Sequence, residues 1–133
     1  MSKLFLKIVC PDGEIFAGDA KSILVTTTSG EIQILASHAD FLAPLATGRA
    51  KLTLEDGSER TASVSGGFIL VTSEETKIVA TTFEFSENID LERAKRAKEN
   101  AEEKLKNAKD DKEIELAKAK LARAISRISV AAK

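Results

Sequence analysis

Glycine and proline are confined to one part of this chain. All 7 glycines and both prolines lie before residue 68, and the chain after Glu87 consists mainly of alanine, lysine and glutamate. Because glycine and proline punctuate turns, their absence from the second part favours uninterrupted helix. The charge changes at the same place: residues 1–88 carry 7 basic and 12 acidic side chains, whereas residues 89–133 carry 13 and 9. The sequence therefore predicts two units of different architecture, residues 1–87 and 88–133.

The composition of the whole chain argues against several classes of protein. Its 133 residues have a formal net charge of −1, so the chain lacks the overall positive charge of a nucleic-acid-binding protein. The longest apolar stretch, residues 41–46, is far shorter than the roughly 18 residues that span a membrane, and the first residues lack a secretory leader. The single Cys10 cannot form an internal disulfide, which suits a reducing compartment. We expect a soluble intracellular protein with no nucleic-acid partner and no direct membrane insertion.

Short apolar segments separated by turn residues follow one another through the first unit. Turn signals occur at residues 11–13, 29–30, 55–58 and 73–76, and the segments between them have no helical period. Strands spaced this closely predict a small antiparallel β-sandwich or barrel. The expected strands cover residues 4–9, 22–28, 31–35, 51–54, 60–64, 68–71 and 77–82.

Apolar residues recur at intervals of three and four in the second unit, which predicts two helices. Asp110 followed by Glu113 resembles a capping box that opens the second helix after a short polar connector, so the helices should form an antiparallel hairpin. Alanines along the seam bury little area and, at about 25 cal/mol per Å², hold the helices weakly, so the hairpin should open easily. The expected seam consists of Ala94, Ala97, Ala101, Leu105, Ile114, Ala117, Leu121, Ala124 or Ile125, and Ile128.

No combination of residues in the sequence indicates catalysis. His38 and Cys10 are the only residues of their kinds and have no spacing typical of metal ligands. We interpret His38 as a surface or turn residue and Cys10 as a small packed hydrophobe. The glycine pair at residues 66–67 is not followed by the lysine of a phosphate loop, so it indicates a bulge or a close approach of two backbones. We therefore expect no enzyme and no metal site.

One segment, residues 84–94, is more suggestive. If a helix begins near Asp90, then Asp90, Arg93 and Ala94 share one face. The spacing alone favours a structural role, in which Asp90 caps the helix and Arg93 forms a local ion pair. The basic residues of the helices would by default be solvated, although their clustering leaves room for an acidic partner or a phosphate ligand. These residues include Lys95, Arg96, Lys98, Arg123 and Arg127.

Four short blocks occur in order along the chain: residues 11–13, residues 29–39 with 43–45, residues 64–68, and residues 89–94, Ile-Asp-Leu-Glu-Arg-Ala. They resemble blocks of the epsilon subunit of bacterial F-type ATP synthases. The first three resemble its first turn, its loop-bearing motif and its second block, and residues 89–94 match its nucleotide-binding motif I/L-D-x-x-R-A. The resemblance runs the full length of the chain and keeps the order of sandwich and helical hairpin.

The resemblance implies a non-catalytic rotor subunit of the central stalk of a proton- or sodium-translocating enzyme. Its sandwich would bind the gamma subunit and the membrane c-ring, and Glu31 and His38 would fall in the loop that faces the ring. That loop departs from the family pattern G-x-L-P-G-H-A-P at Gln33, Ala36, Ser37 and Asp40. The hairpin would either fold onto the sandwich or extend toward the alpha and beta subunits and block ATP hydrolysis. The implied location is peripheral, on the cytoplasmic face of the bacterial inner membrane.

The resemblance also implies ATP, with or without magnesium, as a regulatory ligand rather than a required cofactor. ATP bound to the folded hairpin would stabilise that state by mass action. Neutral Asn100 stands where some relatives carry an arginine, which would weaken phosphate binding. The residues carried over by position are Glu84, Ile89, Asp90, Arg93 and Ala94, with Arg123 and Arg127 on the second helix.

Two alternatives to this function remain open at the level of sequence. The chain could be a purely structural coupling subunit in which the Asp90–Arg93 pair is only a helix cap. More remotely, it could be a free-standing β-sandwich adaptor with a coiled-coil-like tail, in which case the motif matches would be coincidental.

Overall fold

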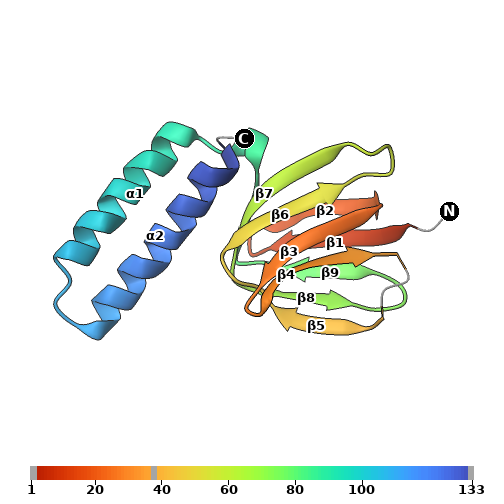
Figure 1. Ribbon diagram of the computed structural model, residues 1–133, viewed down its shortest axis with the longest axis horizontal. Helices are drawn as coiled ribbons and strands as arrows, with labels where there is room; N and C mark the ends of the chain where they lie inside the picture. The colour runs from red at the N-terminus through yellow and green to blue at the C-terminus, as the bar shows by residue number, and fades with distance from the viewer. Residues whose placement is uncertain (1–2, 37–38, 132–133) are drawn as a thin grey trace.

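A computed structural model of the chain describes residues 3–36 and 39–131 as a β-sandwich with a helical hairpin at one end (Figure 1). This confirms the predicted fold class. The strands are β1 (Leu4–Cys10), β2 (Gly13–Ala20), β3 (Ser22–Thr27), β4 (Gly30–Leu35), β5 (Phe41–Pro44), β6 (Gly48–Thr53), β7 (Glu59–Ser65), β8 (Phe68–Val71), β9 (Thr76–Val79) and β10 (Thr82–Phe85). A short 3-10 helix, η1 (Ser86–Asn88), leads to α1 (Leu91–Lys106) and α2 (Asp111–Ala131).

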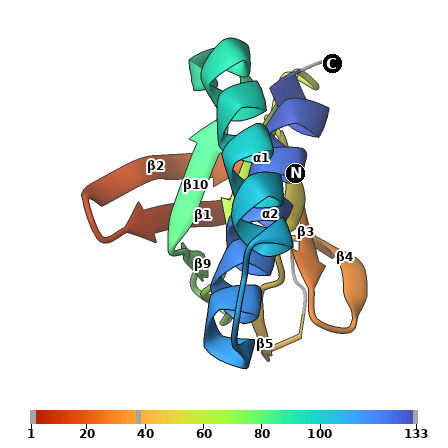
Figure 2. The ribbon, with the colours of Figure 1, turned by 90° about the vertical axis from the view of Figure 1, so that its left-hand side faces the viewer.

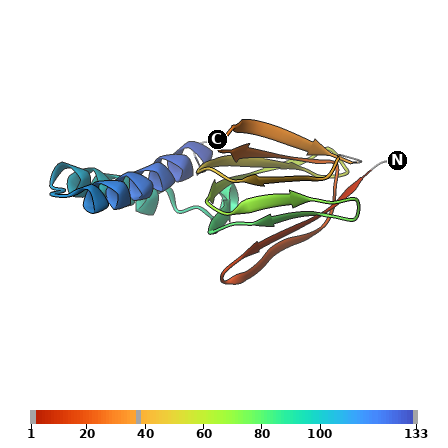
Figure 3. The same ribbon diagram turned by 90° about the horizontal axis from the view of Figure 1, so that it is seen from below.

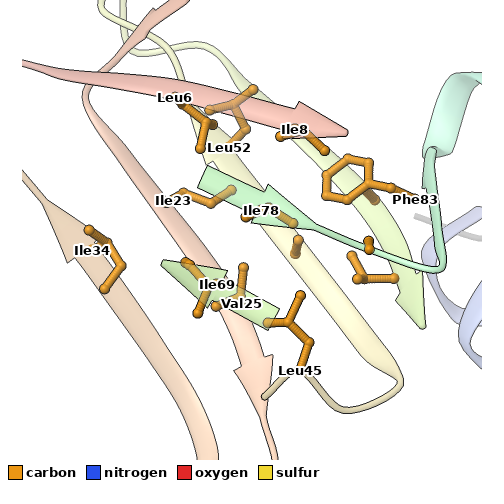
Figure 4. Close-up of a cluster of buried hydrophobic side chains, with 14 of the residues drawn as sticks. Leu6, Ile8, Ile23, Val25, Ile34, Leu45, Leu52, Ile69, Ile78 and Phe83 are labelled. Carbon is orange, nitrogen blue, oxygen red and sulfur yellow. The ribbon is translucent and has the colours of Figure 1, made fainter. Parts of the chain in front are cut away.

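The ten strands form two five-stranded sheets that face each other (Figure 3). One sheet has the order β2-β1-β9-β8-β5 and the other the order β10-β7-β6-β3-β4. Strand alternation directs one side chain in two toward the space between the sheets. In β1, for example, Leu4, Leu6 and Ile8 are buried and Phe5 is exposed. Because a slip of one residue would reverse this pattern, the shared core fixes the register of the strands (Figure 4).

The structure differs from the expected strands in three ways. It contains β2, β5 and β10, which the sequence analysis did not predict, and the expected strand at residues 77–82 is wrong because β9 ends at Val79 and β10 begins at Thr82. Most pairs are antiparallel, but β1 and β9 pair in parallel, with Leu6 opposite Thr76. Pro44 closes β5, which is an edge strand, and an edge tolerates a residue without a backbone N–H.

The glycine pair between β7 and β8 marks a close approach of two backbones, as predicted. Gly66 and Gly67 both have positive φ, and a Cβ on Gly67 would lie 1.9 Å from the carbonyl oxygen of Val79. Only glycine fits at such a place. The contact joins the β7–β8 turn to the end of β9.

The two helices pack antiparallel through a seam of small side chains. Ala94 and Ala101 of α1 and Ala117 and Ala124 of α2 are all buried, whereas Ile125 is 47% exposed. Ala124 is therefore the seam residue of the expected alternatives. At the start of α2 the Asp110 carboxylate accepts a hydrogen bond from the Glu113 N–H at 2.8 Å, and the Glu113 carboxylate accepts one from the Lys109 N–H at 2.8 Å. The predicted capping box is thus present, with its return bond one residue earlier than usual.

The hairpin lies against the sandwich through α2, and α1 lies on the outer side of α2 (Figures 1 and 2). The Ser126 hydroxyl donates a hydrogen bond to the carbonyl oxygen of Gly48 at 3.2 Å and lies 2.8 Å from the hydroxyl oxygen of Ser63. Ser63 is only 5% exposed. The structure is therefore that of the folded hairpin, docked on β6 and β7.

Candidate functional site

A cavity of about 370 Å³ opens where the sandwich, the start of α1 and the end of α2 meet. We call it the junction cavity. Its volume falls at the lower end of the range typical of small-molecule sites. It is lined by Glu84, Asn88, Ile89, Asp90, Arg93, Ala94, Ala97 and Arg127. The structure thus brings together six of the seven residues predicted for ATP, and the seventh, Arg123, lies outside this cavity.

The N-terminus of α1 sets the positions of Asp90 and Arg93. Asp90 has extended backbone angles, and its Oδ1 accepts a hydrogen bond from the Arg93 N–H at 3.1 Å. This is the N-cap geometry that the structural interpretation predicted. The predicted local ion pair of Arg93 is wrong: no salt bridge within residues 3–36 and 39–131 includes its guanidinium, which is exposed at the cavity. Arg93 is therefore available to an anion.

An ion pair closes the opposite side of the junction cavity. The Arg127 guanidinium of α2 donates to Oε1 of Glu84 in β10, and both side chains are about one-third exposed, at 31% and 35%. The two residues are 43 positions apart in the sequence and meet only because α2 lies on the sandwich. The cavity is therefore complete only in the docked arrangement.

A second cavity of about 220 Å³ continues along the hairpin from the first, and we call it the hairpin cavity. It shares Ala97 and Arg127 with the junction cavity, and it contains Arg123 and the neutral Asn100. Its full lining is Ala97, Asn100, Ala101, Lys104, Lys120, Arg123 and Arg127. Sequence analysis did not identify Lys104 or Lys120, whose only signal was the basic composition of the helices.

The link between sandwich and hairpin is held by a contact that sequence analysis also missed. The Arg60 guanidinium of β7 lies 3.7 Å from the ring centroid of Phe85 and donates two hydrogen bonds to Glu87 of η1. The backbone N–H of Glu87 and the Arg60 guanidinium lower the pKa of the Glu87 carboxyl. The contact fixes the direction in which the chain enters α1.

Of the two residues predicted to face the c-ring, the structure describes only Glu31. Glu31 lies in β4, next to the β3–β4 turn, and its Oε2 accepts a hydrogen bond from Nε of Arg49 at 2.9 Å. The guanidinium of Arg49 lowers the pKa of Glu31. The strand continues to Leu35, so Glu31 precedes the expected loop at residues 36–40 by most of the length of β4. Placing Glu31 in that loop was wrong, because the alternating residues 31–35 extend the strand; His38 lies outside the described residues.

Neither a metal centre nor a membrane helix appears in the part of the chain that the structure describes. No group of three or more His, Cys, Asp or Glu side chains there could hold a metal ion. None of the described helices combines the length and hydrophobicity needed to cross a bilayer. Cys10 is half-buried, and burial raises the pKa of its thiol.

Comparison with known proteins gives the family. Residues 3–86 match the β-sandwich domain, and residues 87–132 the long α-helix domain, of the ATP synthase delta/epsilon chain. The chain therefore belongs to the delta/epsilon chain family of ATP synthases. Its function at this level is that of the epsilon subunit in the central stalk of an F-type enzyme.

The relatives match over nearly the whole chain. The ATP synthase epsilon chain of Bacillus pumilus is 39% identical over 133 residues, covering 100% of both proteins. That of Clostridium novyi is 41% identical over 131 residues, covering 98% of this chain and 99% of the relative. A chain of the Euglena gracilis mitochondrial ATP synthase, from a structure of its OSCP, F1 and c-ring, has the same fold. It has a TM-score of 0.85 at 24% identity and covers 100% of this chain and 83% of its own.

Proposed function

We propose that this subunit couples the catalytic head to the c-ring, has no catalytic role of its own, and regulates ATP hydrolysis through its hairpin. In this proposal the hairpin folds onto the sandwich when ATP is bound and otherwise extends toward the alpha and beta subunits. The junction cavity is the observation that carries the proposal. It joins the end of the sandwich to both helices, so a ligand that fills it favours the docked hairpin.

The chemistry of the junction cavity suits a nucleotide. The exposed guanidinium of Arg93 can bind phosphate oxygens in a bidentate manner. The carboxylates of Glu84 and Asp90 can accept hydrogen bonds from the adenine amino group or the ribose hydroxyls, while Ile89 and Ala94 provide apolar surface for the base. Because Arg127 already pairs with Glu84, ATP would have to share or replace that contact.

Titration of the full chain with Mg-ATP, monitored through the NMR shifts of the backbone amides, tests the ATP site. We expect shifts at Glu84, at residues 90–94 and in the second half of α2. Arg93→Ala should weaken binding about 10- to 100-fold, since a hydrogen bond to a charged group contributes about 1.5–3 kcal/mol. Arg96→Ala is the matched control, because Arg96 is exposed on the same helix and does not line the cavity. Wild-type affinity in Arg93→Ala would refute the assignment.

Asp90 needs two substitutions, because it already caps α1. Asp90→Asn keeps a good N-cap but removes the charge, whereas Asp90→Ala removes both. If Asp90 contacts ATP through its charge, both variants lose affinity. If only Asp90→Ala does so, the effect comes from fraying of α1 rather than from a lost ligand contact.

The N-cap hydrogen bond of Asp90 also supports the alternative of a purely structural coupling subunit. In that case, deletion of residues 89–133 from the reconstituted enzyme would leave ATP hydrolysis unchanged. A marked rise in hydrolysis would exclude this alternative and support the inhibitory hairpin.

For the partners of the sandwich we propose the gamma subunit and the c-ring, with the complex at the cytoplasmic face of the bacterial membrane. An exposed apolar surface on β5 and β8 supports a protein partner: Leu42 is 65% exposed and Phe68 41%, and their cross-strand neighbours are Leu70 and Pro44. Leu42→Ser with Phe68→Ser should abolish co-purification with gamma. Retention of gamma would place its binding surface elsewhere. The c-ring contacts of Glu31 and His38 stay predictions.

A further inference from the structure

Arg60 occupies a position of β7 that strand alternation directs toward the core. Its cross-strand neighbour in β6 is Leu52, which is 1% exposed, and Ala62, two residues further along β7, is also buried. Arg60 is the second residue of the strand, and its side chain keeps an exposed fraction of 34%. A charge at the margin of a core needs a partner, and its stem needs a surface to pack on.

Phe85 and Glu87 meet both needs of Arg60. The guanidinium carbon lies 3.7 Å from the ring centroid of Phe85, within the range of a cation–π interaction. Nε and Nη2 of Arg60 lie 3.0 and 2.5 Å from Oε1 of Glu87. We call these three side chains the link clasp, because together they join β7 to the end of β10 and to η1.

The link clasp rests on a well-packed part of the sandwich. Phe85 is 4% exposed, and its ring packs edge to face with that of Phe83 at a centroid distance of 5.3 Å. The backbone of β10 is paired with β7 as far as Phe85, which lies opposite Ala62. None of the three clasp side chains belongs to the hairpin, so undocking of α2 removes none of the contacts among them.

The next residues of the link, 88–90, lack contacts of this kind. Among the described residues, no backbone hydrogen bond joins them to a strand. The Ile89 N–H donates back to the carbonyl oxygen of Ser86 in η1. The carbonyl oxygen of Asp90 accepts from the Ala94 N–H in α1. Because Ile89 and Asp90 also have extended backbone angles, the stretch between the clasp and α1 is the least restrained part of the link.

We propose that Arg60 and Glu87 are positioning residues for the hairpin. The link clasp stays closed when α2 leaves the sandwich, and the hairpin turns about residues 88–90. Three residues span at most about 11 Å, so the start of α1 stays near the sandwich in either position. The hairpin thus has a fixed pivot, and β10 does not peel away from β7 as the hairpin moves. The movement itself rests on the proposed function, whereas the pivot can be tested without a nucleotide.

The test uses the full chain with α2 undocked from the sandwich. Ser126→Glu places a larger, charged side chain against the buried hydroxyl of Ser63, and Arg127→Ala removes the ion pair with Glu84. Neither substituted residue belongs to the link clasp. Altered amide shifts at Gly48 and Ser63, which α2 contacts in the docked arrangement, identify the undocked state.

Nitrogen-15 relaxation of the backbone amides then shows where the rigid part of the chain ends. An order parameter of about 0.85 marks rigid backbone, and one below about 0.6 marks flexible backbone. In the undocked protein we expect residues 83–87 to stay at about 0.85 and residues 88–90 to fall below about 0.6. The boundary between rigid and flexible backbone would then lie directly after Glu87.

Substitution of the clasp should move this boundary toward the sandwich. In the undocked background, Glu87→Gln removes the charge of the acceptor and should lower the order parameters of residues 86–87 below about 0.6. Arg60→Lys keeps the positive charge but loses the planar group that stacks and forks, so it should have the same effect. The matched control is Glu59→Gln, which removes an exposed carboxylate that pairs with Lys51 outside the clasp.

The outcomes distinguish a pivot from a contact that only adds stability. Glu87 lies outside the strands and its side chain is 50% exposed, so Glu87→Gln keeps the sandwich folded whatever the effect of Arg60→Lys. If residues 86–87 become flexible on undocking alone, the clasp opens with the hairpin and the pivot is refuted. A boundary that Glu87→Gln does not move, or that Glu59→Gln moves equally, would also refute it.

The proposed function can fail independently of the pivot. If Mg-ATP leaves the junction cavity unshifted, or if removal of the hairpin leaves ATP hydrolysis unchanged, the proposed regulation fails although the boundary after Glu87 stands. If ATP binds in the junction cavity and the boundary lies elsewhere, the pivot fails and the proposed function stands.

Discussion

Removal of one hydroxyl should measurably loosen the hairpin from the sandwich. In Ser126→Ala the carbonyl oxygen of Gly48 loses its donor at 3.2 Å, and the buried hydroxyl of Ser63 loses its partner at 2.8 Å. Each hydrogen bond contributes about 0.5–1.5 kcal/mol net. Alanine regains part of this through its higher helix propensity, at most about 0.7 kcal/mol. We expect a net loss of about 1–2 kcal/mol in docking free energy.

Native-state hydrogen exchange by NMR measures this loss where it occurs. Most helical stability in proteins comes from tertiary packing, so amides at residues 123–130 should exchange mainly through the undocked state. A loss of 1–2 kcal/mol corresponds to about a 5- to 30-fold decrease in their protection. Amides of Ile8 and Ile78, whose side chains are fully buried in the sandwich, should keep their protection.

Two further variants isolate the hydrogen bonds. Ser129→Ala makes the same change at an exposed position of α2, so it carries the gain in propensity without the loss of contact. A double-mutant cycle of Ser126→Ala with Ser63→Ala should give a coupling of about 0.5–1.5 kcal/mol. Protection in Ser126→Ala equal to that in Ser129→Ala would refute the reasoning, because docking would then rest on other contacts.

Three other perturbations follow from particular contacts. Gly67→Ala forces a Cβ to within 1.9 Å of a backbone oxygen, so it should lower the free energy of unfolding in urea by more than about 3 kcal/mol. The control Gly57→Ala, with φ +90° and nothing within 4 Å, should cost only about 1–2 kcal/mol of backbone strain, and equal losses in the two variants would contradict the clash. Glu87 has a lowered pKa in the folded state, so its contribution to stability should be present above pH 4.5 and decrease as the pH falls through the folded pKa. Glu87→Gln should therefore flatten the acid side of a profile of thermal midpoint against pH, and an unchanged profile would contradict the pairing of Glu87 with Arg60. Lys120 should instead destabilise the fold at neutral pH, because its lowered pKa shows that its charged form is disfavoured in the folded state. Lys120→Gln should raise the thermal midpoint at pH 7, by an amount that shrinks as the pH approaches 10.5. A lower midpoint would show that the charge of Lys120 is favourably paired.

The division of the fold could be predicted from the sequence, because local composition determines it. Glycine and proline cannot occur repeatedly within long helices, and their absence together with the composition rich in alanine, lysine and glutamate after Glu87 placed the hairpin. The missed strands lack a local signal of this kind. In β2, residues 13–20, glycine and aspartate interrupt the apolar pattern, and the strand forms because β1 supplies hydrogen-bonding partners along its length.

The parallel pairing of β1 with β9 could not be inferred from the sequence either. A pattern of alternating residues specifies which face is buried but not the direction or identity of the neighbouring strand. The two strands are about 70 residues apart, and their pairing follows from the closure of the whole sheet rather than from either segment.

For the candidate site, helical spacing predicted only what lies within α1. The spacing of Asp90, Arg93 and Ala94 placed them on one face, and all three line the junction cavity. The addition of Glu84 and Arg127 came from the family resemblance, since no local rule joins positions 43 apart. Lys104 and Lys120 were indistinguishable in sequence from other helical lysines, because what sets them apart is a contact between helices.

The way these cavities are assembled links ligand binding to the position of the hairpin. The junction cavity takes Glu84 from β10, Arg93 from α1 and Arg127 from α2, so it does not exist when α2 leaves the sandwich. A ligand selective for the docked state therefore stabilises it by RT ln(1 + [L]/Kd), or about 2.7 kcal/mol at a hundredfold excess over Kd. That exceeds the loss of about 1–2 kcal/mol expected for Ser126→Ala. A saturating ligand should accordingly restore exchange protection of α2 in Ser126→Ala. Because the thin alanine seam holds the helices only weakly, ligand binding of this strength is enough to control the position of the hairpin.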